Sequence, residues 1–173
     1  MSAEAVARPA LGSDTPLRFL PKAIRVPENP LKAIAFGWLT AFPISVLLAV
    51  TAGALMPHVA RPEFPVSGTA ALLGLVIFSP IVETVTMGLV LLVLLRFLQP
   101  VVAIGVSAIG WGIVHSLLAP TWGLVIWWPF LIFSTLFTAW RGRSLALAFA
   151  LPTCVHALQN LLPAILVANG IAA

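Results

Sequence analysis

Charged side chains are scarce in this sequence. Asp, Glu, Lys and Arg together make up 8% of its 173 residues, against about 25% in a typical soluble domain. Hydrophobic residues reach 61%, and the mean hydropathy is +1.10. This composition excludes an ordinary water-soluble domain and predicts a polytopic membrane protein.

Cysteine is nearly absent as well. The single cysteine, Cys154, excludes an intrachain disulfide and a zinc cluster built on cysteines. Because it lies within an apolar run, we interpret it as a small buried packing residue. An apolar core of a signal peptide is also missing before Ala33, so we expect no cleavage of the N-terminal region.

Acidic residues are outnumbered, five against nine basic ones. Five of the basic residues precede the first apolar run: Arg8, Arg18, Lys22, Arg25 and Lys32. Positive charge beside a membrane span is the usual cause of such a cluster. We therefore expect the lipid bilayer, and not nucleic acid, as the partner of this region.

Long apolar runs account for most of the remaining chain. They cover residues 33–56, 69–95, 100–140 and 144–168. The third run is too long for one span, and the Pro and Gly of segment 119–123 divide it into two. The sequence thus predicts an all-α fold, a transmembrane helix bundle of about five spans.

The loops between these runs predict a domain plan and an orientation. Residues 1–32 form a basic, proline-containing arm, and residues 33–173 form the transmembrane domain. Arg96, Arg141 and Arg143 fall on the same side as the arm, and Arg61 falls on the other. By the positive-inside rule the N terminus is cytoplasmic and the C terminus lies outside, as in a multi-pass protein of the cell's inner membrane.

Two further groups of residues are expected at the membrane edge. His58 lies in the loop 57–68, where we expect it to face water. Four tryptophans near the ends of the spans are typical of an aromatic belt at the interface: Trp122, Trp127, Trp128 and Trp140.

Three ionisable residues interrupt the apolar runs. Glu83, His115 and His156 each lie in a different predicted span. Counted from the cytoplasmic end of its span at about 1.5 Å per residue, they lie about 18, 21 and 18 Å deep. Ionisable groups are costly inside a bilayer and usually mark functional sites. We therefore expect the three side chains to meet and form a metal-dependent hydrolytic site.

Asn160 is the fourth candidate residue. It follows His156 by four positions, so both side chains project from one helix face. Neutral imidazoles are standard ligands of zinc and similar divalent metals, and a carboxylate beside such a metal is the usual general base for peptide hydrolysis. His115 and His156 supply two ligands, and the third is the Asn160 oxygen, Glu83 or water. Asn160 has an alternative role as a hydrogen-bond donor to the developing oxyanion.

These residues carry a resemblance to a known family. Residues 80–84, 111–115 and 156–160 resemble, in order, the three motifs of the CPBP (Abi) intramembrane metalloproteases, which include the type II CAAX prenyl endopeptidases. The family pattern is Glu-Glu-x-x-x-Arg, then Phe-x-x-x-His, then His-x-x-x-Asn, each on its own helix. The resemblance covers about residues 70–165.

The resemblance implies an intramembrane endopeptidase that cleaves a membrane-associated peptide or protein with a divalent metal, zinc being the first candidate. Glu83 matches the glutamate that activates water, and the metal site matches His115, His156 and Asn160. Three positions depart from the pattern: Thr84 replaces the second glutamate, Gly88 the arginine and Trp111 the phenylalanine. Losing the glutamate and the arginine together removes a buried ion pair without stranding either charge.

Three alternative functions stay open at this point. A relative with this fold but without activity would serve as a membrane binding or immunity protein, which the losses at positions 84 and 88 would permit. Two histidines on facing helices are also typical of a bis-histidine haem in an electron carrier. Finally, Glu83 would suit a small proton-coupled transporter, although the chain shows no internal repeat.

Overall fold

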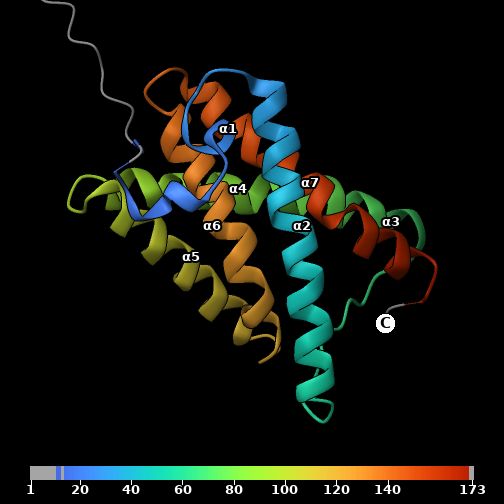
Figure 1. Ribbon diagram of the computed structural model, residues 1–173. Coiled ribbons are helices and arrows are strands. Elements are labelled where there is room, and N and C mark those ends of the chain that lie inside the picture. The colour runs from blue at the N-terminus through green and yellow to red at the C-terminus, as the bar shows by residue number, and fades with distance from the viewer. Residues whose placement is uncertain (1–10, 13, 172–173) are drawn as a thin grey trace, which may run out of the picture.

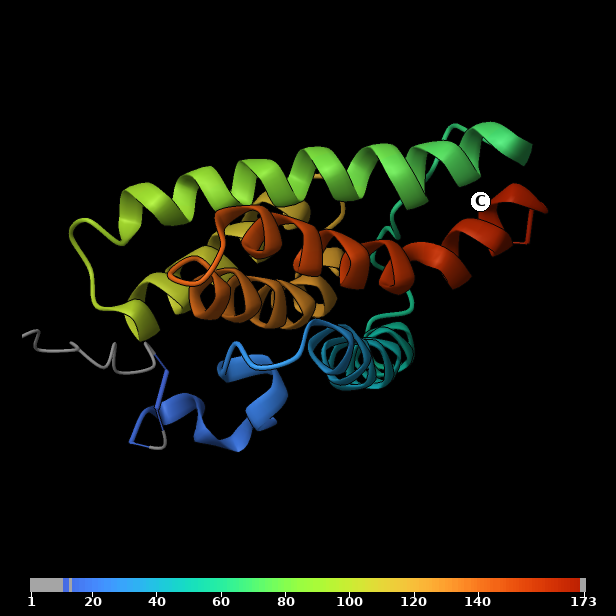
Figure 2. The ribbon, with the colours of Figure 1, turned by 90° about the horizontal axis from the view of Figure 1, so that it is seen from above.

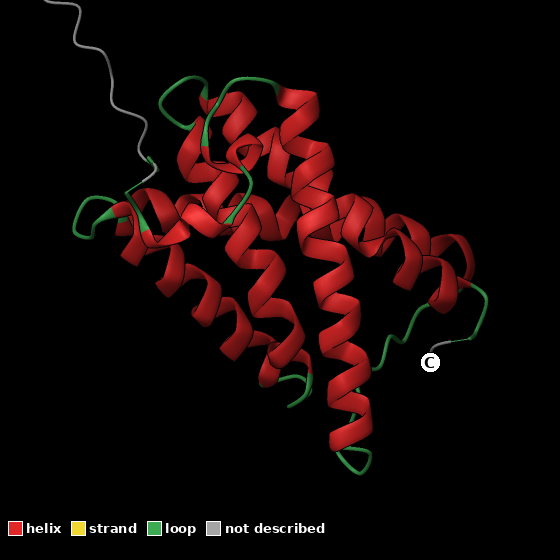
Figure 3. Ribbon diagram, in the orientation of Figure 1, coloured by secondary structure: helices red, strands yellow, loops and turns green. Residues whose placement is uncertain are grey.

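The computed structural model describes residues 11–12 and 14–171. Residues 1–10, 13 and 172–173, and with them Arg8 of the predicted arm, lie outside this range. Within it every regular element is a helix (Figures 1 and 3), which confirms the predicted all-α fold. The elements are η1 (Pro16–Phe19), α1 (Lys22–Arg25), α2 (Pro30–Leu55), α3 (Gly68–Leu72), η2 (Leu73–Phe78), α4 (Ser79–Leu94), α5 (Pro100–Ser116), α6 (Trp122–Trp140) and α7 (Leu145–Ala168).

Prolines and polar caps set where these helices begin. Helix α2 begins at Pro30, and the side chain of Asn29 accepts the backbone N–H of Lys32. Helix α5 begins at Pro100. Proline is well suited to the first helical position, because the N–H that it lacks would have no partner within the helix there. The Ser144 hydroxyl accepts the N–H of Leu147 at the start of α7. The observed helices therefore follow the predicted runs closely.

Among the described residues, four helical stretches are long and apolar enough to cross a membrane: Pro30–Leu55, Gly68–Leu94, Trp122–Trp140 and Leu145–Ala168. The remaining predicted span, the third along the chain, corresponds to helix α5; this helix is apolar but has 17 residues, a length of about 26 Å. The outer faces of the helices are apolar too, since α2 exposes Leu47 and Val50 and α4 exposes Leu89 and Val93. This is the architecture of a multi-pass protein embedded in a lipid bilayer.

Helix α6 lies at the centre of the bundle. It packs against α2, α5 and α7, and its buried side chains include Phe130, Phe133, Phe137 and Trp140. Helices α5 and α6 form an antiparallel pair, whereas α4 and α7 lie side by side and run across the direction of α2 (Figures 1 and 2). A Cβ at Gly123 would overlap the Gly112 carbonyl oxygen, so this glycine permits the close approach of α5 and α6.

Two sequence interpretations are corrected by this packing. Trp140 is fully buried among the core residues, so it is not part of an interfacial belt. Cys154 is exposed on α7 and not buried, because the core-facing side of this helix is occupied by Val155 and His156. His58 is exposed in its loop, as predicted.

The described part of the N-terminal arm folds against the bundle. Leu17, Leu20 and Ile24 are buried with the core residues of the helices. The Arg25 guanidinium donates to backbone carbonyls of the arm itself. Arg143, in the turn between α6 and α7, donates to the carbonyls of Pro27 and Glu28. The arm and the α6–α7 turn therefore lie at the same end of the bundle.

Candidate functional site

Glu83 and the two histidines meet between helices α4, α5 and α7. The Oε2 atom of Glu83 lies 3.7 Å from Nε2 of His115 and 3.9 Å from Nε2 of His156. Both histidines are buried, and the Glu83 side chain is 25% exposed. Two imidazoles that are far apart in the sequence thus each place Nε2 near the same carboxylate oxygen.

The Glu83 carboxylate is oriented from its own helix. The hydroxyl of Ser79, one turn earlier on α4, donates to Oε1 of Glu83. This contact engages one carboxylate oxygen and leaves Oε2 to the histidines. Sequence reasoning did not select Ser79, although its i, i+4 spacing from Glu83 is a signal that would have found it.

The imidazole of His115 is held in one orientation by its helix and by aromatic neighbours. Its Nδ1 lies 2.8 Å from the carbonyl oxygen of Trp111. A carbonyl can only accept, so Nδ1 carries the hydrogen, and Nε2, which faces Glu83, presents a lone pair when the ring is neutral. The ring of Trp122 meets the imidazole edge-on at 4.8 Å between centroids. Trp111 thus orients the imidazole of His115 through its backbone carbonyl.

His156 has a corresponding pair of contacts. Its ring stacks on Phe133 at 4.8 Å between centroids, and its Nδ1 lies 3.4 Å from Oγ1 of Thr84. Phe130 contacts both imidazoles, at 5.8 Å from His115 and 5.6 Å from His156. Helix α6 therefore forms an aromatic wall behind the two histidines, which excludes water from that side.

Asn160 lies one turn beyond His156 but makes a different contact. Its Nδ2 donates to the carbonyl oxygen of Leu75, at 3.0 Å. Leu75 belongs to η2, a π-helical stretch that leads directly into the turn carrying Ser79 and Glu83. The amide nitrogen of Asn160 is thus engaged by the backbone, and the amide oxygen is the atom left for a metal or a substrate.

Two of the three departures from the resembled pattern, those at positions 84 and 88, have structural counterparts. Thr84 is fully buried, and its hydroxyl faces His156 from the position where the resembled pattern has its second glutamate. At Gly88 a Cβ would overlap ring atoms of Phe149 and Phe137. The Phe149 ring fills the space beside α4 that a longer side chain at position 88 would need. An arginine at this position would therefore have to displace Phe149.

The side-chain types of the cluster, though not its present spacing, are those of a divalent transition-metal site. Ligand atoms bound tetrahedrally to zinc at about 2.1 Å are roughly 3.4 Å apart, a few tenths of an ångström less than the two distances from Glu83 to the histidines. The three side chains are accordingly farther apart than the ligands of a bound zinc ion, and among the described residues no group of three or more His, Cys, Asp or Glu side chains is arranged to hold a metal ion. Two neutral imidazoles and a carboxylate oxygen are the ligand types that zinc prefers.

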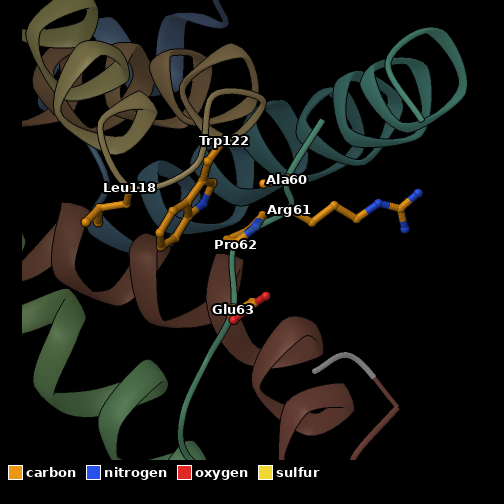
Figure 4. Close-up of a pocket in the computed structure, with 6 residues that line it drawn as sticks. All are labelled: Ala60, Arg61, Pro62, Glu63, Leu118 and Trp122. Carbon is orange, nitrogen blue, oxygen red and sulfur yellow. The ribbon is translucent and has the colours of Figure 1, made fainter. Parts of the chain in front are cut away.

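A pocket of about 340 Å³ lies near the site, at the end of the bundle that carries Arg61. It is bounded by the loop after α2 and by the α5–α6 turn (Figure 4); its lining residues are Ala60, Arg61, Pro62, Glu63, Leu118 and Trp122. The indole of Trp122 forms part of its wall and also contacts His115. Sequence reasoning assigned Trp122 to an interfacial belt, and only the fold shows that it separates this pocket from the histidine.

The fold and the site define a multi-pass helical membrane protein with a carboxylate and two imidazoles clustered inside its bundle. Comparison of the chain with protein-family models, with curated proteins and with solved structures finds no match.

Proposed function

We propose that the protein is an intramembrane metal-dependent endopeptidase, a divergent relative of the CPBP family, that cleaves a membrane-associated peptide or protein. The observation that carries the proposal is the convergence of Glu83, His115 and His156 on one point inside an apolar bundle. Burying three ionisable groups together in a membrane protein is costly, and they are retained where they serve a function.

Each residue has a role in this proposal. Glu83 is the general base: it takes a proton from the attacking water and returns it to the leaving amine. The Ser79 hydroxyl orients the carboxylate for this transfer. His115 and His156 hold the metal through Nε2, each fixed by the contact at its Nδ1. The aromatic rings of Phe130 and Phe133 limit the access of water to the histidines.

A divalent metal, zinc in the first instance, would be held by these histidines and, when bound, would supply Lewis acidity toward the scissile carbonyl and toward water. His115 and His156 are its ligands, and the Asn160 oxygen or Glu83 is the third. The donor chemistry and the shared direction of the two Nε2 atoms support this assignment.

We also propose that the protein lies in the cell's inner membrane with its N terminus in the cytoplasm. The arm contacts the α6–α7 turn, so the basic residues of these two segments share one end of the bundle. A concentration of positive charge at one end favours the cytoplasmic side.

The haem alternative has less support from this geometry. The Oε2 atom of Glu83 lies within 4 Å of both Nε2 atoms, and a bis-histidine haem has no need of a carboxylate beside its two ligands. Aromatic rings also pack directly on the imidazoles. A relative without activity, acting as a binding or immunity protein, is the second candidate, and it is favoured by Thr84 and Gly88 at two positions of the family motif.

Cleavage of a membrane-peptide library separates these two candidates. We expect wild type to cleave and Glu83→Gln, which keeps the shape of the side chain but not its basicity, to lose at least about 10²-fold in rate. Glu28→Gln is the matched control, because Glu28 is an exposed carboxylate paired with Lys22. Equal cleavage by wild type and Glu83→Gln would show that Glu83 is not the base, and the absence of cleavage by wild type would favour the binding protein.

A further inference from the structure

The backbone just before Glu83 contains an unusual feature. Residues Leu73–Phe78 form a π-helical stretch, and the N–H of Ser79 bonds to the carbonyl of Gly74, five residues earlier. In an α-helix that N–H would bond to the carbonyl of Leu75. In the π-helical register the Ser79 N–H is therefore not available to the carbonyl oxygen of Leu75.

The π-helical partner of Leu75 is missing too. With i to i+5 bonding, the carbonyl of Leu75 would accept the N–H of residue 80. Residue 80 is Pro80, which has no N–H. Neither register thus supplies a backbone donor to this carbonyl, and an unpaired carbonyl inside a membrane protein is strongly unfavourable.

Asn160 supplies the missing donor. Its Nδ2 lies 3.0 Å from the Leu75 oxygen and comes from helix α7, on the same face as His156. From there a chain of contacts leads to the carboxylate: Asn160 holds Leu75, η2 is followed directly by Ser79, and the Ser79 hydroxyl donates to Glu83. Helix α7 therefore provides the histidine and also fixes the stretch that sets the position of Glu83.

We propose that Asn160 is a positioning residue for Glu83, which acts by holding the π-helical stretch Leu73–Phe78 through the carbonyl of Leu75. The effect of Asn160 on catalysis rests on the function proposed above. The hydrogen bond from Asn160 to the Leu75 carbonyl is independent of that function. This role differs from those of metal ligand and oxyanion donor, because the amide acts on the protein backbone and not on the reacting atoms.

Pro80 makes the proposal testable. In Pro80→Ala the chain gains an N–H at position 80, so the Leu75 carbonyl obtains a backbone partner and Asn160 becomes dispensable. The experiment compares wild type with Asn160→Leu, Pro80→Ala and the double variant. Gln159→Leu is the matched control, since it removes a neighbouring amide whose Oε1 has no hydrogen-bond partner within the described residues.

Two measurements report on Glu83. The first is the rate at which dicyclohexylcarbodiimide labels Glu83, followed by mass spectrometry, which needs no enzymatic activity. The second is peptide cleavage, with the bound metal determined in parallel. We expect Asn160→Leu to label severalfold faster, because Glu83 loses its fixed position beside Ser79, and to cleave at least about tenfold more slowly with its metal content retained. Gln159→Leu is expected to behave as wild type.

The double variant decides between the roles. Recovery of the labelling rate in Pro80→Ala/Asn160→Leu to that of Pro80→Ala supports the positioning role, as does recovery of folding if Asn160→Leu alone does not fold. A double variant as impaired as Asn160→Leu, or loss of metal in Asn160→Leu, would overturn it in favour of direct action. If wild type does not cleave but the labelling pattern holds, the proposed function fails and the positioning role stands.

Discussion

The hydroxyl of Thr84 lies 3.4 Å from Nδ1 of His156, and Thr84 is completely buried. An imidazole that binds a metal through Nε2 almost always has a partner at its other nitrogen, which fixes the orientation of the ring. Thr84 provides that partner for His156, and the carbonyl of Trp111 provides it for His115.

Replacing Thr84 by valine tests this contact. Valine has nearly the same shape, so the fold should persist, but the partner of Nδ1 is lost. We expect the affinity for zinc to fall about 10–100-fold, as is typical when such a partner is removed, measured by competition with a chelator of known affinity. Thr84→Ser retains a hydroxyl and should bind zinc more tightly than Thr84→Val. Equal affinities in wild type and Thr84→Val would show that the hydroxyl does not support the ligand.

Gly88→Ala tests the packing of α4 against its neighbours. A Cβ at position 88 overlaps the rings of Phe149 and Phe137, and overpacking of this kind costs about 1–3 kcal/mol. We expect a lower thermal unfolding temperature in detergent. Gly105→Ala on α5 is the control, because a Cβ there meets nothing within 4 Å, and it should be neutral or mildly stabilising. A Gly88→Ala variant as stable as Gly105→Ala would contradict the packing described for α4.

The orientation in the membrane is tested with single cysteines. In a Cys154→Ser background, His58→Cys lies in the loop after α2 and Gly142→Cys in the α6–α7 turn. With a cytoplasmic N terminus, a membrane-impermeant maleimide should label position 58 from outside intact spheroplasts and position 142 only in inverted vesicles. Labelling of position 142 from outside would reverse the orientation proposed here.

Much of the helical plan could be predicted from the sequence because it depends on local chemistry. Prolines and glycines punctuate the apolar runs, so α5 begins at Pro100 and the turn before α6 contains Pro120. Glu83, His115 and His156 were recognisable because an ionisable group in an apolar run is rare. Their meeting was a hypothesis drawn from depth, and the structure brings them together.

The contacts around the site depend on packing between distant segments, which a single sequence does not reveal. Nothing local indicates that Asn160 reaches the carbonyl of Leu75, 85 residues away, or that Trp122 packs on His115. In the sequence, Gly88 stands where the resembled motif has an arginine. The structure shows that this position has no room for a side chain. Pro80 was visible in the sequence, but its effect on Leu75 depends on the π-helical register.

The central claim is that His115 and His156 hold a metal beside Glu83, and metal analysis tests it most directly. Wild type, His115→Ala, His156→Ala and the loop variant His58→Ala would be loaded with zinc in detergent, washed and analysed by elemental mass spectrometry. We predict about one zinc per chain in wild type and in His58→Ala, since His58 is an exposed loop residue outside the proposed ligand set, and little in either site variant. Equal zinc content in all four proteins would contradict the ligand assignment and, with it, the proposed metal-dependent hydrolysis.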